Sequence, residues 1–284
     1  MFNELSHKID FSAIITVTNA NPNGDPLNGN RPRETDEGYG EISDVCIKRK
    51  IRNRLQDMGE KILLQSDDRC DDGCDSLQMR VSQNERLKKV KKTDRGQFAE
   101  IACEEWIDVR SFGQMFAFKG DTSTINVRGP ISIHPVISVS PVNIVSSQIV
   151  KSVNGEGGKE GRSSDTMGMK HRVPFGMYIV HGSINCQLAS KTGFNDEDAD
   201  KIKEAICTLF ENDASAARPE GSMEVCRVYW WDHDCKTPKT NSAKVHRSLQ
   251  VKLKDGVTMP HSFDDYDISL SKIDGVEPEI IDLM

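Results

Sequence analysis

Near the start of the chain, every second residue from Ile9 to Val17 is apolar, and this alternation constrains the fold most. Strict alternation predicts a half-buried β-strand. The strand runs into residues 19–26, Asn-Ala-Asn-Pro-Asn-Gly-Asp-Pro, which are typical of turns. The fold therefore begins with a β-strand that ends in a tight, polar loop.

An amphipathic helix is predicted after this loop, with Ser43 as N-cap and Asp44 in the first turn. The predicted apolar stripe is Ile47, Ile51, Leu55, Met58 and Ile62. The stripe is flanked by bases, Lys48, Arg49, Lys50, Arg52 and Arg54, and no acid lies between Val45 and Gln56. We expect the balancing anions to come from outside the helix. A nucleic-acid backbone, bulk solvent and the acidic C-terminal segment are the alternatives.

Later segments continue the succession of strands and helices. The predicted elements are a helix near Phe98–Trp106, a strand over 125–133 broken at Gly129-Pro130, a strand near Tyr178–Leu188, a helix capped by Asn195, and strands at Met223–Trp231 and Val245–Leu253. This order is that of a β-α-β-β-α-β unit. The fold class is therefore α+β, a single ferredoxin-like (RRM-like) domain over 1–284. That fold hosts many functions, so function must be inferred from the sites.

Charge is distributed unevenly along the chain. The 37 Lys and Arg against 44 Asp and Glu give a net charge of -7, which at first argues against a nucleic-acid partner. Residues 255–284, however, contain eight acids and one base, so this acidic C-terminal tail accounts for the whole net charge. Residues 64–96 lack a regular pattern, being acidic and then basic, and we interpret them as a surface insertion. An acidic average is therefore compatible with a basic nucleic-acid groove.

A glycine-rich segment at 138–172 predicts an arm outside the core. Asn154 to Gly168 contains five glycines and almost nothing apolar. The arm ends in Met167, Met169, Lys170 and His171, which would let methionines wedge between bases while the cations hold phosphates. A disordered loop is the alternative.

The sequence offers few signs of an enzyme. It has no phosphate-binding loop, no nucleophile elbow and no zinc-protease motif, so we expect no metal and no cofactor. Asp25, Asp36 and Glu37 could ligate a metal and His171 could transfer protons, but turn formation or phosphate contact is favoured. The eight cysteines are scattered and no secretory signal precedes them, so we expect free thiols in a cytoplasmic protein without a membrane span.

Several short blocks resemble one known family, the backbone subunit of the type I-C CRISPR surveillance complex (Cascade), in the Cas-seven branch of the RAMP superfamily. The blocks are 19–26, 43–53 (Ser-Asp-Val-Cys-Ile-Lys-Arg-Lys-Ile-Arg-Asn), 108–113, 127–130, 166–171 (Thr-Met-Gly-Met-Lys-His), 189–194 and 213–218 (Asp-Ala-Ser-Ala-Ala-Arg). The insertion at 64–96 has no counterpart that we can match.

The resemblance implies a non-catalytic protein shaped like a hand, with an RRM-like palm, a fingers insertion and a long thumb hairpin. Copies would stack head to tail in a helical filament along one CRISPR guide RNA, which then pairs with target DNA. Other Cascade subunits would occupy the filament ends, together with a large subunit. The RNA-binding residues carried over by the resemblance are Asn21, Asn23, Lys48, Arg49, Arg52, Arg128, Met167, Met169, Lys170 and His171.

Two other classes of function are compatible with the sequence. One is a metal-dependent ribonuclease of the RAMP superfamily that cuts RNA paired to the guide, with Asp25 or Asp36 as the catalytic acid. The other is a scaffold whose basic helix docks an acidic protein. Cleavage of a guide-complementary RNA would indicate the first, and failure to bind guide RNA would indicate the second.

Overall fold

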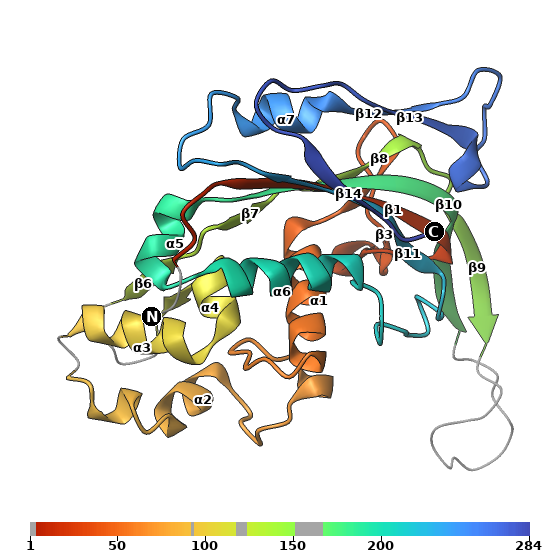
Figure 1. Ribbon diagram of the computed structural model, residues 1–284. Helices are drawn as coiled ribbons and strands as arrows, with labels where there is room; N and C mark the ends of the chain where they lie inside the picture. Colours follow the sequence, from red (N-terminus) through yellow and green to blue (C-terminus); the bar gives the residue numbers. More distant parts are fainter. Residues whose placement is uncertain (1–3, 92–93, 118–123, 151–166) are drawn as a thin grey trace, which may run out of the picture.

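An antiparallel sheet of eight strands forms the centre of the molecule (Figure 1). The computed structural model describes residues 4–91, 94–117, 124–150 and 167–284. From one edge to the other, the paired strands are β14 (Pro278–Asp282), β11 (Met223–Asp232), β1 (Ile9–Ala20), β10 (Met167–Ile184), β8 (Val136–Pro141) and β4 (Tyr39–Ile42). The strands β7 (Ile131–Ile133) and β9 (Val145–Val150) pair with opposite ends of β10. The first strand of the chain thus lies between two strands from its second half.

Helices α1 (Asp44–Asp57) and α6 (Asp196–Cys207) cover one face of the sheet (Figure 1). Their apolar residues share one core with β1, because Ile47, Ile51 and Ile202 pack in the same cluster as Phe11. The predicted N-caps are confirmed: Ser43 and Asn195 each accept a hydrogen bond from the backbone amide three residues on. Helix α1 ends at Asp57, so the predicted stripe is wrong at its end, where Met58 is the C-cap and Ile62 lies beyond the helix.

A second layer covers the opposite face of the sheet. It consists of α7 (Ser242–Ser248), β12 (Leu249–Leu253) and β13 (Tyr266–Leu270). Ile14 and Trp231 of the sheet pack there with Val245 and Tyr266. Strand β1 is therefore buried on both faces from Ile9 to Val17, and the prediction of a half-buried strand is wrong. Its polar residues tolerate burial because they form hydrogen bonds inside the core.

The other predicted elements match the structure to different degrees. The helix near Phe98 is confirmed as α3 (Arg95–Glu105), and the broken strand is confirmed as β6 (Ile125–Arg128) followed by β7. The strand near Tyr178 begins earlier than predicted, and its last four predicted residues fall outside it, where α5 (Cys186–Thr192) begins. The strand predicted at Val245–Leu253 is correct for β12 only, because α7 occupies the first half.

The described residues between 58 and 128 form a lobe with its own small core. After η2 (Asp67–Arg69), α2 (Leu77–Gln83) and η3 (Leu87–Lys89), the lobe continues through α3, α4 (Ile107–Phe112), β5 (Gly113–Phe116) and β6. Val81 and Leu87 of the predicted insertion pack there with Ile101 and Trp106. The residues at 64–96 are thus part of a packed unit, not a bare surface loop. None of the described helices is long and apolar enough to cross a lipid bilayer.

The acidic C-terminal segment is not a free tail. After η4 (Phe263–Asp265), strand β13 pairs with β12, and β14 adds an edge strand to the central sheet beside β11. Ile273 and Val276 are buried in the second core. The expected acidic tail at 255–284 is therefore an integral layer of the fold, because its apolar residues cover the outer face of the sheet.

Candidate nucleic-acid interface

The loop after β1 is folded tightly against a second loop. It contains β2 (Gly24–Asp25), η1 (Pro26–Asn28) and β3 (Arg31–Pro32). Asn21 is 2% exposed; its side-chain amide donates a 2.6 Å hydrogen bond to the carbonyl of Asn30, and its backbone amide donates a 2.9 Å bond to that of Ala217. Asn21 thus fastens the 19–26 loop to the 213–218 loop, and its side chain is buried rather than exposed to a ligand.

Asn23 connects this loop to the first turn of α1. Its side-chain oxygen accepts hydrogen bonds from the backbone amide of Ser43 at 2.9 Å and from the Ser43 hydroxyl at 3.0 Å. Ser43 in turn accepts a bond from the amide of Cys46. The loop and the helix terminus therefore form one hydrogen-bonded unit.

Asn23→Ala is expected to lower the free energy of unfolding by about 1 to 2 kcal/mol, because it leaves the amide and hydroxyl of Ser43 without this acceptor. Urea denaturation monitored by circular dichroism measures the change. Asn28→Ala, at an exposed position in the same loop, is the control and is expected to change stability by less than 0.5 kcal/mol. Equal losses in the two variants would contradict the structural role of Asn23.

Two of the predicted RNA-binding residues on α1 contact other parts of the chain, Arg52 as a buried residue and Arg49 as a partly exposed one. Arg52 is 8% exposed, donates a 3.0 Å hydrogen bond to the Asp108 carboxylate and lies over the Phe112 ring. Arg49 donates to the carbonyl of Leu64, and burial, reinforced by the nearby Arg52, lowers its pKa. The structure gives Arg52 an internal ion pair, which replaces the expected contact with an RNA phosphate.

The remaining bases of α1 are also paired within the chain. Their partners are Asp44 for Lys48 (2.9 Å), Asp213 for Lys50 and Glu211 for Arg54 (2.7 Å). Burial lowers the pKa of Lys50, and the adjacent Asp213 opposes this shift. The anions expected from outside the helix are thus supplied largely by carboxylates of the same chain. Of the three predicted bases on this helix, Lys48 and Arg49 keep partial exposure.

The end of the glycine-rich segment forms one strand of a hairpin. Met167–Arg172 of β10 pairs antiparallel with Val145–Val150 of β9, and we call these twelve residues the β9–β10 hairpin. It extends away from the sheet at the right of Figure 1. The segment between the two strands, 151–166, which includes most of the glycine-rich stretch, lies outside the described residues.

Alternation along β10 sorts the predicted thumb residues into two faces. Met167 and Met169 lie on the same face as His171 and are 63% and 55% exposed, whereas Lys170 points to the opposite face. His171 Nδ1 lies 2.8 Å from the Ser146 hydroxyl across the hairpin. The hairpin therefore presents two exposed, flexible thioethers on one face and an exposed cation on the other.

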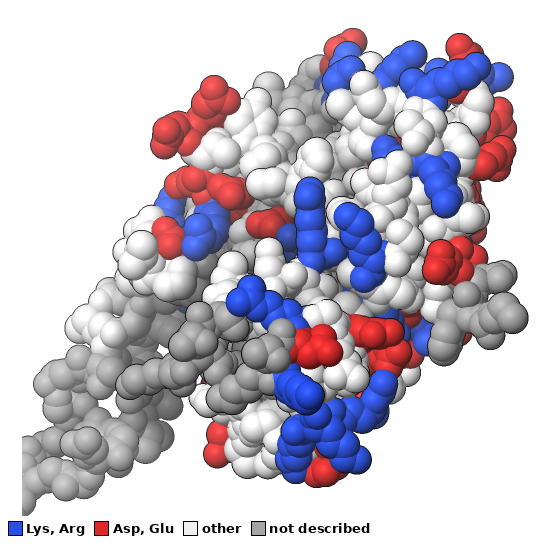
Figure 2. Space-filling model, turned by 90° about the vertical axis from the view of Figure 1, so that its left-hand side faces the viewer, with Lys and Arg blue, Asp and Glu red and all other residues white. Residues whose placement is uncertain are grey.

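Arg128 lies at the other end of the sheet from this hairpin. It is exposed at the end of β6, next to α5, which follows the last residue of β10. Figure 2 shows this end of the molecule face-on, with Lys and Arg side chains gathered at its upper and lower parts. Arg128 and Met167 lie at opposite ends of β10, whose 18 residues correspond to a path of roughly 60 Å along the curved strand. Arg128 and Met167 therefore cannot contact the same nucleotide within one copy.

Three bases near the hairpin and the 19–26 loop were not predicted as site residues from the sequence. Arg31 donates a 3.2 Å hydrogen bond to the Ser146 hydroxyl, which links β3 to the hairpin. Arg33 contacts Asp25 at 3.5 Å, and Arg218 contacts Asp213 at 3.3 Å. All three are partly exposed. Arg31 and Arg33 directly follow the turn at Asn28–Asn30, and Arg218 ends the 213–218 block. Their positions beside these blocks could have indicated that they lie near the site.

Asp25, one of the three acids considered as metal ligands, serves other contacts. Asp25 accepts a 3.2 Å hydrogen bond from the amide of Leu27, as cap of the short helix η1, and it contacts Arg33. Across the described residues, no group of three His, Cys, Asp or Glu side chains is arranged to hold a metal ion. Asp25 is therefore a turn-forming residue with a basic neighbour.

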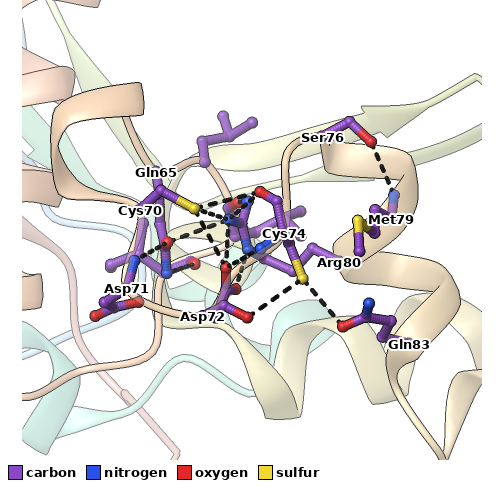
Figure 3. A network of polar contacts seen from close by, with 12 residues as sticks. Gln65, Cys70, Asp71, Asp72, Cys74, Ser76, Met79, Arg80 and Gln83 are labelled. Atoms are coloured by element: carbon purple, nitrogen blue, oxygen red, sulfur yellow. Dashed lines mark hydrogen bonds and ion pairs between the residues drawn. The ribbon is translucent and has the colours of Figure 1, made fainter.

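Cys70 and Cys74 belong to a hydrogen-bond network centred on Arg80 (Figure 3). The buried guanidinium of Arg80 binds the Asp72 carboxylate with two nitrogens, donates to the carbonyls of Leu63 (2.8 Å) and Cys74 (3.3 Å) and lies 3.7 Å from Cys70 Sγ. The Arg80 bond holds the pKa of Asp72 well below its usual range. All eight cysteines are free thiols. This network folds the 66–76 loop onto α2.

Comparison with known proteins places the chain in a family. The family model described as CRISPR-associated protein Cas7 matches residues 7–271. A CRISPR-associated protein Cas7 from Haloferax volcanii is 25% identical over 223 residues, which cover 68% of this chain and 61% of that protein. The chain thus spans about three fifths of that relative's length.

Comparison with solved structures finds one chain with a similar fold and a second, weaker match. A chain of a CRISPR RNA-guided surveillance complex in a pre-nicking state has a TM-score of 0.51 and 15% identity, covering 89% of this chain and 84% of that chain. A second CRISPR RNA-guided surveillance complex has a TM-score of 0.46 and 16% identity, covering 88% and 78%. The match of the family model over nearly the whole length decides the assignment: this chain belongs to the CRISPR-associated Cas7 family.

Proposed function

We propose that the protein is a non-catalytic backbone subunit of a type I-C CRISPR surveillance complex, which binds guide RNA and presents it for pairing with target DNA. Copies stack head to tail along the RNA as a helical filament, and other Cascade subunits cap the ends or join alongside. Membership of the Cas7 family and the fold shared with a surveillance-complex chain support this role.

The single observation that carries the proposal is the β9–β10 hairpin. It places exposed Met167 and Met169 on one face, while Lys170 and Arg172 lie on the other. Polarisable side chains can insert between unstacked bases, and cations beside them can hold the flanking phosphates. In this proposal the hairpin is the thumb, which interrupts the RNA at regular intervals.

The order of the sheet supports an RRM-like palm. The strands β11, β1, β10 and β8 are neighbours in the antiparallel sheet, with α1 and α6 on one face. This is the strand order of a ferredoxin-like β-α-β-β-α-β unit. The lobe at 58–128 then corresponds to the fingers. Because guide pairing supplies sequence specificity, the protein needs to recognise only the RNA backbone and its shape.

The RNA-binding residues that we propose combine sequence and geometry. These groups are exposed or partly exposed and lie on the hairpin, on the loops beside it and on α1: Met167, Met169, Lys170 and His171; Arg31, Arg33 and Arg218; Lys48 and Arg49. Asn21 and Asn23 hold the loop in position, and Arg128 serves the stretch of RNA at the opposite end. An RNA strand bound by stacked copies would meet both ends in turn, as heterologous contacts generate an open helix.

Charge reversal at the hairpin end tests this function. The double variant Arg31→Glu, Lys170→Glu is expected to weaken binding of guide RNA regardless of sequence, and to reduce the slope of log K against log salt by about 0.7 per lost phosphate contact. Fluorescence anisotropy with labelled RNA between 50 and about 300 mM salt measures both quantities. Arg31→Lys, Lys170→Arg is the charge-preserving control and should retain the slope.

An unchanged slope in the charge-reversed variant would remove the hairpin end from the RNA interface. Metal-dependent cleavage of an RNA complementary to the guide, lost in Asp25→Ala, would instead identify a ribonuclease and contradict the non-catalytic role. Failure of the wild-type chain to bind guide RNA at all would contradict the proposed function as a whole.

A further inference from the structure

In one segment of the chain, every Lys, Arg, Asp or Glu position is a base. None of its residues belongs to the proposed guide site. From Cys235 to Lys254 the sequence contains six Lys or Arg residues and no Asp or Glu. In a protein of net charge -7, twenty residues without an acid form a strong local excess of positive charge. The segment spans the loop before α7, α7 itself and β12.

Folding gathers four of these bases with one from another helix. The loop before α7 packs against α5, because Gln187 Nε2 lies 3.4 Å from the Thr237 hydroxyl. Helix α7 is fixed beside the end of β10 through a 3.1 Å hydrogen bond from His246 Nε2 to the Gly182 carbonyl. All five bases of the resulting surface are exposed. We call them the α5–α7 patch: Lys191, Lys236, Lys239, Lys244 and Arg247.

The positive charge of this patch is not neutralised by the rest of the described chain. No carboxylate of the described residues lies within ion-pair distance of any of its five side chains, although each of Lys48, Lys50, Arg52 and Arg54 on α1 has one. Two exposed acids, Asp232 and Asp234, precede the segment; Asp232 is paired with His7 at 3.0 Å, and neither lies within ion-pair distance of the patch. Figure 2 shows Lys and Arg side chains at the top of this face, at the height at which α7, β12 and β13 lie in Figure 1. The patch is thus available to an external polyanion.

The composition of the patch indicates which kind of polyanion it binds. Protein interfaces are depleted in Lys and are anchored by large apolar or aromatic side chains. None of the large apolar side chains exposed in the described residues lies within 186–192 or 235–248. Spaced, flexible cations without an apolar anchor suit a phosphodiester backbone, because binding such a backbone requires charge neutralisation and little shape complementarity.

We propose that the α5–α7 patch is a second nucleic-acid site, which binds the phosphodiester backbone of a strand other than the guide without regard to sequence. The patch lies at the Ile184 end of β10, whereas the β9–β10 hairpin lies at its Met167 end. A strand held by the patch is therefore separate from one held under the hairpin of the same copy. The guide contact proposed at this end, Arg128, belongs to β6 and not to the patch. This site does not require the proposed function, because the chain can bind a backbone there with or without guide RNA.

The test is a triple charge reversal, Lys239→Glu, Lys244→Glu, Arg247→Glu, matched by the charge-preserving Lys239→Arg, Lys244→Arg, Arg247→Lys. Duplex DNA, single-stranded DNA and single-stranded RNA, all unrelated to the guide, are titrated at several salt concentrations with the full chain, free and guide-bound. We expect the reversal to weaken duplex binding at least tenfold and to reduce the salt slope by about 0.9 per lost contact. The matched variant should behave as wild type, and guide-RNA affinity should change less than twofold.

Three results would overturn the proposal. Unchanged affinity and slope for all three probes would show that the patch binds no backbone. A parallel loss of guide-RNA affinity would make the patch part of the guide site and not a second one. Loss of contact between copies in sedimentation, with probe binding intact, would assign the patch to an acidic protein surface. The three probes identify which kind of strand the patch holds best.

Discussion

Replacing Asp108 by alanine is expected to lower the free energy of unfolding by about 3 to 5 kcal/mol. The carboxylate is 1% exposed and accepts hydrogen bonds from Arg52 Nε (3.0 Å) and from the backbone amides of Leu63 (2.8 Å) and Leu64 (3.1 Å). Its removal leaves a buried guanidinium without its counter-ion and two amides without their acceptor. Chemical denaturation at pH 7 measures the loss.

The exposed pair between Arg86 and Glu104 provides the control for this prediction. Glu104→Ala removes one member of an ion pair in solvent and is expected to cost less than about 1 kcal/mol. The double variant Arg52→Met, Asp108→Leu removes both buried charges and is expected to recover part of the loss, since no unpaired charge remains. A loss in Asp108→Ala no larger than that in Glu104→Ala would show that Arg52 is solvated and free to contact a ligand.

Acidification from pH 6.5 to pH 5 is expected to destabilise the protein by about 2 kcal/mol through His181. Burial, with the neighbouring His246 and His134, lowers the pKa of His181 to about 3, against about 6.5 in the unfolded chain. Below pH 6.5 the unfolded chain binds a proton that the folded chain does not. Stability therefore falls with decreasing pH, by about 1.4 kcal/mol per unit well below 6.5, until the folded pKa is reached.

The imidazole cluster on the outer face of the sheet explains this behaviour. The rings of His181 and His246 stack at 4.7 Å between centroids, and the Ser12 hydroxyl lies 2.7 Å from His181 Nδ1. Burial also lowers the pKa of His246, with the same sign of effect on stability. Carboxylates whose pKa is lowered in the fold, such as Asp72, lose their contribution mainly below about pH 5. The window between pH 6.5 and 5 therefore isolates the histidines.

Urea denaturation of the wild type and of His181→Gln, each at pH 6.5 and pH 5, measures the effect. The variant should show a smaller difference between the two pH values, whatever its absolute stability. His261→Gln, in an exposed loop, is the matched control and should keep the wild-type difference. Equal pH differences in the wild type and in His181→Gln would contradict the assignment to His181.

Local signals allowed much of the fold to be predicted from the sequence. The Ser43 and Asn195 caps, the apolar spacing of α1 and the alternation of β1 each act within a few residues, and each is visible in one stretch of chain. Helix α7 was missed because Val245–Leu253 alternates like a strand, although Asn241 accepts a hydrogen bond from the amide of Lys244 as a helix cap. Burial of both sheet faces depends on a layer formed by later residues, so no local pattern could indicate it.

The candidate site was harder to predict, because its electrostatics depend on distant partners. Arg52 and Asp108 are 56 positions apart, and Lys50 and Asp213 are 163 apart. In the sequence, a helix rich in bases therefore resembles a ligand-binding face. In the folded chain, carboxylates from distant positions lie beside these bases. Resemblance to a family predicted a thumb arm containing Met167 to His171, and these residues lie on one strand of the β9–β10 hairpin, but their role in RNA binding stays a prediction. The resemblance could not show that Arg128 lies at the other end of the sheet.

The position of β1 between β10 and β11 also has a consequence for synthesis on the ribosome. The strand emerges first, yet its two partners end at Ile184 and Asp232. At about 5 to 20 residues per second, roughly 10 to 45 seconds pass before the second partner is translated. During that time an apolar strand with open edges is exposed outside the ribosome. The nascent chain is therefore a natural client for chaperones, and slow codons before residue 232 would prolong its risk of aggregation.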